Sequence, residues 1–236
     1  VIVTAGKDSG LGPVKMVIGE TSTTLEVTAA APLIETTQSQ VTNTFTGTTL
    51  STFAGIQENE GLDRLALFVP GVVATRSDNF SNTNGVGFSS NGLRGRNNDQ
   101  EIDGQNNNDN SVAGPGLFVS DTEFVQQYVL ITNQFGPEYG RNAGSVVNVI
   151  TKSGTRNFHG DAYEFFRNDI LQANNYFNNL VHAKRPPLRY NDFGYTIGGP
   201  VFIPGHYNTD RNRTFFFFSQ EFRRVITYGT LNLTGD

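Results

Sequence analysis

The sequence predicts an α+β domain, built as a small mixed sheet with short helices, followed by antiparallel strands of the transmembrane β-barrel type. Apolar, β-branched segments separated by Gly- and Asn-rich turns fill the chain up to about Ser153, with one short amphipathic segment among them. After Gly154, segments of about ten residues alternate with polar loops, and this is the length of a tilted membrane strand. No run of about 18 apolar residues occurs, so no transmembrane helix is expected.

The composition excludes several kinds of site and partner. The 236 residues carry a net charge of -5 and no basic segment dominates, so nucleic acid is not expected as a partner. Cysteine is absent, which excludes disulfides, thiolate metal sites and a cysteine nucleophile. The 26 glycines, together with many Asn and Thr residues, favour strands and loops over long helices.

Two buried strands form the clearest signal in the chain. Tyr128–Thr132 (YVLIT) and Ser145–Thr151 (SVVNVIT) are apolar and rich in β-branched residues. The segment between them contains EYGRNAG and is typical of a turn, and KSGT at Lys152–Thr155 ends the second strand.

The run YGRNAGSVVNVITKSG resembles the closing signature of the plug domain of TonB-dependent outer-membrane receptors. Its continuation, TKSGTRNFHGDAYEFFRND, resembles the Oar-like branch of that family. The resemblance implies a plug domain over residues 30–153 and the first, incomplete strands of an outer-membrane β-barrel over residues 154–236. It also implies the outer membrane of a Gram-negative-type bacterium, with the plug facing the periplasm. The implied partners are the TonB C-terminal domain, the remainder of the β-barrel, outer-membrane lipid and an unknown extracellular substrate.

GETSTTLEVTAAAPLIET resembles the tail of the carboxypeptidase-regulatory-like β-sandwich that precedes the plug in Oar-like receptors, and residues 1–29 are therefore predicted to be this tail. Within it, TTLEVTA resembles the TonB box, a short extended segment that pairs with a strand of TonB. Backbone hydrogen bonds supply the affinity in this mode of binding, so the segment need only be extended. An ordinary strand of the sandwich is the alternative. The TonB-box residues are Thr23, Thr24, Leu25, Glu26, Val27, Thr28 and Ala29.

One helix and two further strands are predicted in the plug. Leu62–Val69 places apolar residues at i, i+3, i+4 and i+7, which is one face of a short helix, and Pro70-Gly71 ends it. Phe88–Arg94 and Asp99–Asp103 are predicted as strands around a turn. We expect both to join the two buried strands above in one central sheet.

Three charged residues match the plug pattern and are predicted to contact the barrel wall. Arg94 stands in the Arg-Gly step GLRGR, and Glu138 and Arg141 match EYGR. Basic residues of such plugs face acidic residues on the inner barrel wall, so we expect Arg94 to pair with a carboxylate, because a buried charge is costly unless it is paired. A solvated surface arginine is the alternative.

A polar loop follows, QNNNDNSVAGPG at Gln105–Gly116. Its side-chain amides offer donors and acceptors without charge, which suits contact with a polar ligand. The family places such loops at the plug apex, where substrate is captured, and a flexible solvated loop is the alternative. The residues of this ligand-loop prediction are Asn106, Asn107, Asn108, Asp109 and Asn110.

A calcium-binding loop is a weaker interpretation of the segment that begins at Asp99. Asp99, Glu101, Asp103 and Gly104 match its pattern loosely. However, the third position is Glu and the twelfth is Asn110 rather than Glu. A strand and turn are therefore predicted there, and no metal site or cofactor is.

Three segments are predicted as barrel strands: Phe158–Asn168, Asp192–Ile203 and Arg213–Arg223. In the last of them, Phe216, Phe218 and Phe222 fall on one parity. A soluble sheet is the alternative, and the four consecutive Phe residues disfavour it. Val225–Leu233 is predicted as a fourth strand.

No enzyme is predicted, since the sequence contains no H-E-x-x-H, G-x-S-x-G or Walker A motif and no catalytic residue is assigned. The expected function is that of a transporter, in which the plug gates substrate uptake through the barrel. A β-rich structural or adhesive subunit of a cell-surface assembly is the alternative. The stretch after Gly154 suffices for about four strands, so we expect either a longer receptor or edge strands that pair with other chains.

Overall fold

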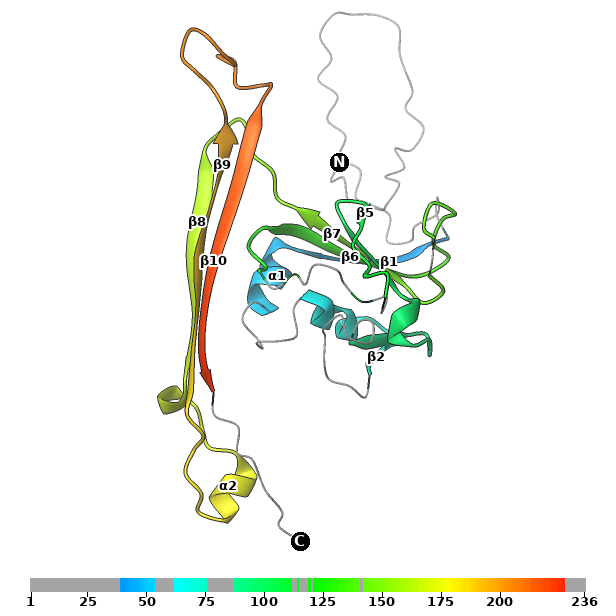
Figure 1. Ribbon diagram of the computed structural model, residues 1–236, viewed down its shortest axis with the longest axis vertical. Coiled ribbons are helices and arrows are strands. Elements are labelled where there is room, and N and C mark those ends of the chain that lie inside the picture. Colours follow the sequence, from blue (N-terminus) through cyan, green and yellow to red (C-terminus); the bar gives the residue numbers. More distant parts are fainter. Residues whose placement is uncertain are drawn as a thin grey trace, which may run out of the picture. The chain divides into compact units, whose positions relative to one another are not determined.

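The computed structural model describes residues 39–53, 62–75, 87–111, 114, 119, 121–140 and 142–227 (Figure 1). These residues form two compact units. The first contains the described residues up to Thr151, and the second contains those from Lys152 onward. The predicted sandwich tail and TonB box lie outside the described residues.

The first unit contains a mixed five-stranded sheet in the order β1-β6-β7-β4-β5. Its strands are β1 (Val41–Thr46), β4 (Asp99–Ile102), β5 (Gln105–Asn106), β6 (Val125–Asn133) and β7 (Val146–Thr151). Neighbouring strands are antiparallel except for β4 and β7, which are parallel. The small mixed sheet that the sequence predicts is thus confirmed.

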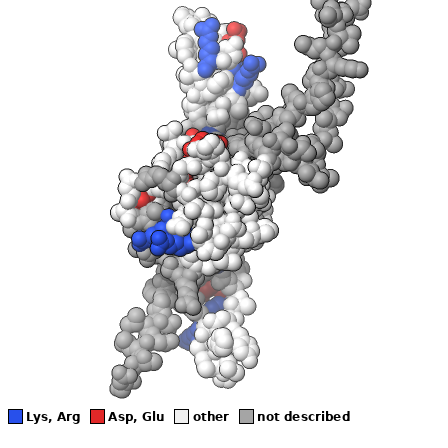
Figure 2. Space-filling model, turned by 90° about the vertical axis from the view of Figure 1, so that its right-hand side faces the viewer, with Lys and Arg blue, Asp and Glu red and all other residues white. Residues whose placement is uncertain are grey.

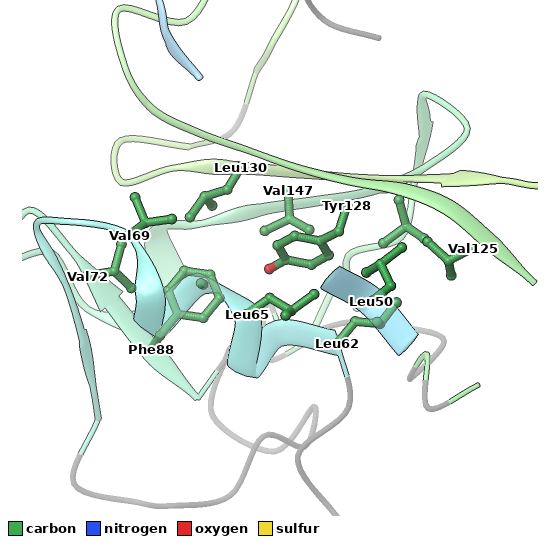
Figure 3. Close-up of a cluster of buried hydrophobic side chains, with 12 residues drawn as sticks. Leu50, Leu62, Leu65, Val69, Val72, Phe88, Val125, Tyr128, Leu130 and Val147 are labelled. Carbon is green, nitrogen blue, oxygen red and sulfur yellow. The ribbon is translucent and has the colours of Figure 1, made fainter. Parts of the chain in front are cut away.

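Strand β6 runs through the centre of this unit and is covered on both faces. Tyr128 and Leu130 point to one side and join Val147 in the main hydrophobic core (Figure 3). Val129 and Ile131 point to the other side and pack with Val146, Phe135 and Tyr139. Burial on both faces explains why this strand is a continuous apolar run rather than an alternating one.

Short elements cover the face of the sheet that carries Tyr128. They are α1 (Gly47–Phe53), the 3-10 helix η1 (Leu62–Phe68), and a two-stranded sheet of β2 (Val72–Ala74) and β3 (Phe88–Ser90). The predicted helix is therefore present, with Leu62, Leu65 and Ala66 on its buried face, but it is wound as a 3-10 helix.

The prediction that Phe88–Arg94 is a central strand was wrong. Only Phe88–Ser90 is a strand, and it pairs with β2 outside the five-stranded sheet. The chain turns at Asn91 and Gly92, whose φ angles are 52° and 78°. The Asn91 N–H donates to the Gly71 carbonyl at 2.8 Å, and its side-chain amide donates to the Thr132 carbonyl at 2.7 Å. These bonds hold the turn in place and end the strand. The other three predicted central strands share one sheet, as expected.

Neither β1 nor α1 was predicted from the sequence. Strand β1 pairs with β6 along the edge of the sheet, and Phe45 packs on Tyr128 with ring centroids 6.1 Å apart. Its sequence, VTNTFT, is rich in residues of high β-propensity, but it contains only one large apolar residue. The hydrophobic signal was therefore weak.

The second unit is an antiparallel sheet in the order β10-β9-β8 (Figure 1). Strand β8 is His159–Asn168, β9 is Leu188–Pro200 and β10 is Phe215–Thr227. All three predicted strands are present, although β9 begins earlier and β10 ends later than expected. Val225–Thr227 of the predicted fourth strand continue β10, and its remaining residues lie outside the described part of the chain.

The connection between β8 and β9 contains two short helices, η3 (Asp169–Leu171) and α2 (Tyr176–Leu180). Asn168 and Asn175 cap them, each accepting a hydrogen bond from a backbone N–H two or three residues later. Within the described residues, no helix is long and apolar enough to cross a membrane.

Candidate functional site

The two faces of the three-stranded sheet differ in chemistry. Directly paired residues of antiparallel strands project to the same side, so the register assigns each residue to a face. One side, here called the apolar face, carries large side chains that are 36–51% exposed. It comprises Ala162, Phe166, Phe193, Tyr195, Ile197, Phe218, Phe222 and Ile226, with Glu164 and Gln220 among them.

Aromatic pairs extend across the strands of the apolar face. Phe193 and Phe222 are directly opposite in register, and their rings stack with centroids 5.5 Å apart. Tyr195 packs diagonally on Phe218 at 6.0 Å. Such contacts stabilise cross-strand pairing. A contiguous exposed surface of this kind on a folded protein marks a site of contact with a membrane or a partner.

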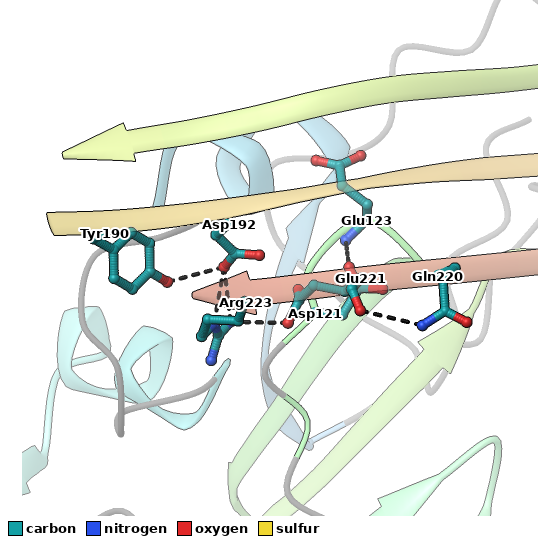
Figure 4. Close-up of polar contacts among 7 residues, drawn as sticks. All are labelled: Asp121, Glu123, Tyr190, Asp192, Gln220, Glu221 and Arg223. Atoms are coloured by element: carbon teal, nitrogen blue, oxygen red, sulfur yellow. Dashed lines mark hydrogen bonds and ion pairs between the residues drawn. The ribbon is translucent and has the colours of Figure 1, made fainter. Parts of the chain in front are cut away.

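The opposite side, here called the polar face, carries a charged cluster (Figure 4), and the register also places the aromatic residues Phe165, Phe215 and Phe217 on this side. Asp192 Oδ2 accepts hydrogen bonds from Tyr190 Oη at 2.9 Å and from Arg223 Nε and Nη2 at 3.1 and 2.9 Å. Arg223 also lies 3.1 Å from Glu221 Oε1. Asp192 is only 2% exposed, so its charge is compensated by close partners rather than by water.

Sequence reasoning missed this cluster. The charges of Asp192 and Arg223 are visible in the sequence, but nothing in it fixes the register that places them opposite each other. The parity of the residues along each of β9 and β10 was the available signal. It indicates which residues share a face within one strand and leaves the pairing between strands open.

An ionisable pair is buried among the described residues of the first unit. Asp63 lies on η1 and is 8% exposed, and its Oδ1 accepts a hydrogen bond of 3.3 Å from the Tyr128 hydroxyl on β6. Burial raises the pKa of Asp63 to about 6, although the bond from Tyr128 opposes this rise. Burial and the neighbouring carboxylate also raise the pKa of Tyr128. Asp63 was not predicted, since it occupies a position between the apolar residues that defined the helix face.

The three residues predicted to contact the barrel are placed only in part. Arg94 is exposed, and its Nε donates to Asn97 Oδ1 at 3.4 Å. Among the described residues it forms no ion pair. Glu138 is also exposed, and Arg141 lies outside the described residues. The pairing of Arg94 with a carboxylate therefore stays a prediction.

The predicted ligand loop uses several of its side chains to hold its own backbone. Asn106 Oδ1 accepts from the Asn108 N–H at 2.8 Å, and Asp109 Oδ1 accepts from the Ser111 N–H at 2.7 Å. Asn108 reaches back to β4, where its Oδ1 accepts from the Gln100 N–H at 3.0 Å. Asn106 and Asn110 are exposed. The loop is thus built on asparagine side chains, and ligand contact by its exposed members stays a prediction.

The segment that loosely matches a calcium loop is a β-hairpin. Asp103 and Gly104 have φ angles of 50° and 74° and form the two-residue turn between β4 and β5. The Asp103 carboxylate accepts hydrogen bonds of 2.8 Å from the N–H and the hydroxyl of Thr151. Asp99 Oδ1 instead accepts from Asn108 Nδ2. In the part of the chain that the structure describes, no three acidic or His residues gather into a metal-binding group.

Basic side chains do not form a continuous surface on the side of the molecule shown in Figure 2. There the Lys and Arg residues of the described segments gather in a few groups separated by neutral surface.

Comparisons with known proteins agree with the two-faced sheet. A family model described as an outer membrane beta barrel domain matches residues 150–234. The TonB-dependent transporter Oar of Myxococcus xanthus is 29% identical over 176 residues, which cover 72% of this chain and 15% of Oar.

Two solved structures share the fold. The outer membrane transporter YddB from Escherichia coli matches with a TM-score of 0.51 and 14% identity, over 68% of this chain and 24% of YddB. The ferric citrate transporter FecA, in its unliganded form, matches with a TM-score of 0.50 and 13% identity, over 70% of this chain and 23% of FecA.

This chain thus spans less than a quarter of the length of each of these three relatives. The relatives are transporters rather than enzymes, and the barrel match indicates an outer-membrane location. By sequence and by fold, this chain is similar to part of the TonB-dependent transporters of the outer membrane.

Proposed function

We propose that this chain is the plug domain and the first barrel strands of a TonB-dependent outer-membrane receptor, in which the plug gates substrate uptake through the barrel. The observation that carries the proposal is the separation of the second unit into an apolar and a polar face. Strands that alternate apolar residues toward lipid and polar residues toward the lumen are the pattern of outer-membrane barrels.

The strands have the dimensions that this role requires. Strand β8 contains 10 residues, and β9 and β10 contain 13 each. A tilted membrane strand needs about 9–11 residues. Strands β8 and β10 are edges of the described sheet, and an unpaired edge in lipid costs several kcal/mol per unsatisfied backbone group. Further strands of the same barrel would remove this cost.

The first unit is assigned to the plug, which would face the periplasm. Its mixed sheet precedes the barrel strands in the chain, as in the sequence signature YGRNAGSVVNVITKSG. The segment Thr23–Ala29 would bind the TonB C-terminal domain as an added strand. The similarity to Oar, whose name identifies it as TonB-dependent, supports this partner.

The absence of cysteine from this chain allows a direct test with single nitroxide labels. The full-length receptor is reconstituted in lipid with a label at Tyr195→Cys or Phe218→Cys on the apolar face, or at Ser219→Cys on the polar face. We expect the first two labels to collide with dissolved oxygen more than with a water-soluble nickel reagent. Ser219→Cys, next to Phe218 on the other side of β10, is the matched control.

Each outcome separates the proposal from the alternative. An adhesive or structural subunit outside the membrane would leave the Tyr195→Cys and Phe218→Cys labels accessible to the nickel reagent or buried from both. If the labels at Tyr195 and Ser219 showed the same ratio of collisions with oxygen to collisions with the nickel reagent, the assignment of two different faces would be wrong.

A further inference from the structure

The apolar face changes character toward the end of the sheet that carries the β8–β9 connection. The Phe193–Phe222 pair is followed by Asn191 opposite Arg224, and then by Arg189 opposite Ile226. Arg189 and Arg224 are therefore on the same face, in adjacent strands and in diagonal positions. Diagonal neighbours of this kind are about 7–8 Å apart, so two arginine side chains can reach one anion between them.

The arginines on the two faces of the sheet differ in whether a carboxylate lies beside them. Arg223 on the polar face is paired with Asp192 and Glu221. Arg189 and Arg224 are exposed, and among the described residues neither guanidinium group has a carboxylate or another hydrogen-bonding partner. Two guanidinium groups are thus left uncompensated beside the stacked rings of Phe193 and Phe222.

The surroundings of the two arginines favour an anion. The connection between β8 and β9 carries exposed Lys184 at the same end of the sheet, together with Arg185, whose guanidinium group donates to the carbonyls of Ile170 and Gln172. Of the nearby carboxylates, Asp169 accepts from the Leu188 N–H at 3.4 Å. Glu164 lies on the apolar face on β8, separated from Arg224 by the whole of β9, which is about 10 Å at the ordinary strand spacing.

We propose that Arg189 and Arg224 bind the phosphate of an anionic membrane lipid whose acyl chains lie against Phe193 and Phe222. This inference rests on the proposed function, because it requires the apolar face to be in contact with lipid. Guanidinium groups bind phosphate oxygens through paired N–H donors, and the adjoining aromatic surface accommodates hydrocarbon. A free phosphate ion would contact only the guanidinium groups. A lipid would also contact the aromatic surface, so the two features together favour a lipid.

The test uses the full-length receptor in bilayers with spin-labelled phosphatidic acid or spin-labelled phosphatidylcholine, both carrying the label on the acyl chain. We expect motionally restricted lipid with either probe, and a preference for phosphatidic acid of about fivefold per arginine at low salt. The double variant Arg189→Gln/Arg224→Gln should lose this preference. Arg213→Gln, an exposed arginine at the opposite end of β10, should keep it.

The outcomes distinguish failure of this inference from failure of the proposed function. No restricted lipid with either probe would contradict the membrane contact itself. Restricted phosphatidylcholine without a preference for phosphatidic acid, or a preference that the double variant retains, would overturn the lipid site alone. Loss of the preference in millimolar inorganic phosphate at constant ionic strength would show a site for free anions instead. Unchanged restriction of phosphatidylcholine by the double variant shows that its sheet is still folded.

Discussion

Tyr128 donates a 3.3 Å hydrogen bond to the carboxylate of Asp63 inside the hydrophobic core of the first unit. The bond connects η1 to the central strand β6, and both residues are almost fully buried. A carboxylate in this position penalises the folded state when it is ionised, because burial favours its neutral form.

This penalty predicts a pH dependence of stability. The pKa of Asp63 is about 6 in the folded unit, against 3.8 for the ordinary side chain. Between these two pH values the folded state therefore binds a proton that the unfolded state has released. The free energy of unfolding should therefore fall by up to about 3 kcal/mol as the pH rises from about 4 to about 6. Above about pH 6 it should change little. Hydrogen exchange of the β6 amides, corrected for intrinsic rates, measures this. Asp63→Asn should flatten the profile, and a variant with the same slope would exclude Asp63 as its source.

Removal of Arg223 should be costly, because it leaves Asp192 buried without its cation. We expect Arg223→Gln to lower the free energy of unfolding by about 3 kcal/mol, near the lower end of the range for buried pairs, since Arg223 is 22% exposed. Arg224→Gln, one residue later on the apolar face, should cost less than about 0.5 kcal/mol. Urea unfolding of the receptor in detergent compares the two. Equal effects of the two variants would mean that the cluster contributes nothing specific.

The polar loop offers a pair of variants that separate support from ligand contact. Asn108→Ala removes one of the two acceptors of the Gln100 N–H and the amide that donates to Asp99, and we expect it to destabilise the unit by about 1 kcal/mol. Asn110→Ala changes an exposed side chain and should cost less stability than Asn108→Ala. If the loop captures substrate, Asn110→Ala should lower substrate affinity by more than its effect on stability explains. Unaltered affinity of Asn110→Ala would argue against capture at that residue.

The TonB-box prediction concerns residues that the structure does not describe. A proline at Leu25 removes a backbone donor and restricts the residue before it, so Leu25→Pro should abolish strand addition to the TonB C-terminal domain. Leu25→Ala keeps the N–H group and should bind nearly as well as the natural sequence. Calorimetric titration of TonB into each variant compares them. Unchanged affinity of Leu25→Pro would leave the sandwich-strand interpretation.

Arg94 is predicted to pair with a carboxylate of the complete barrel. Arg94→Ala in the full-length receptor should then cost about 3–5 kcal/mol and reduce uptake, because a desolvated carboxylate would lose its partner. Arg94→Lys, which keeps the charge, should recover part of the loss. Thermal stability and uptake that do not change in Arg94→Ala would favour a solvated arginine.

The elements predicted best from the sequence are those whose own residues show a clear pattern. Strands β6 and β7 were evident because burial on both faces requires an uninterrupted apolar run. Strands β8 to β10 were evident because they are segments of about ten residues flanked by polar loops. Strand β1 was missed because its edge position requires little hydrophobicity. The length of β3 was misjudged because a tertiary bond from Asn91 to Thr132 helps to fix the turn that ends it.

The polar groups of the site were harder to predict for a related reason. A hydrogen bond between Asp192 and Arg223, or between Asp63 and Tyr128, joins residues that are 31 and 65 positions apart in the chain. Periodicity describes one element at a time, whereas such pairs depend on register and on packing between elements. The Asn-rich loop was recognised as polar, yet nothing in its residues indicates that the Asn108 side chain bonds to β4.

The order of strands in the first unit also determines how it would respond to a mechanical load. Strands β1 and β7 both run antiparallel to β6 and hence in the same direction, so the start of β1 and the end of β7 lie at opposite ends of the sheet. Tension applied before Val41 and resisted after Thr151 would act along the strands, across hydrogen bonds that run perpendicular to them. The hydrogen bonds between β1 and β6 would be loaded in shear and at the same time, so they would not break one pair after another. A partner that pulls on the N-terminal segment would therefore meet its greatest resistance at this edge of the sheet, before the core around Tyr128 is disturbed.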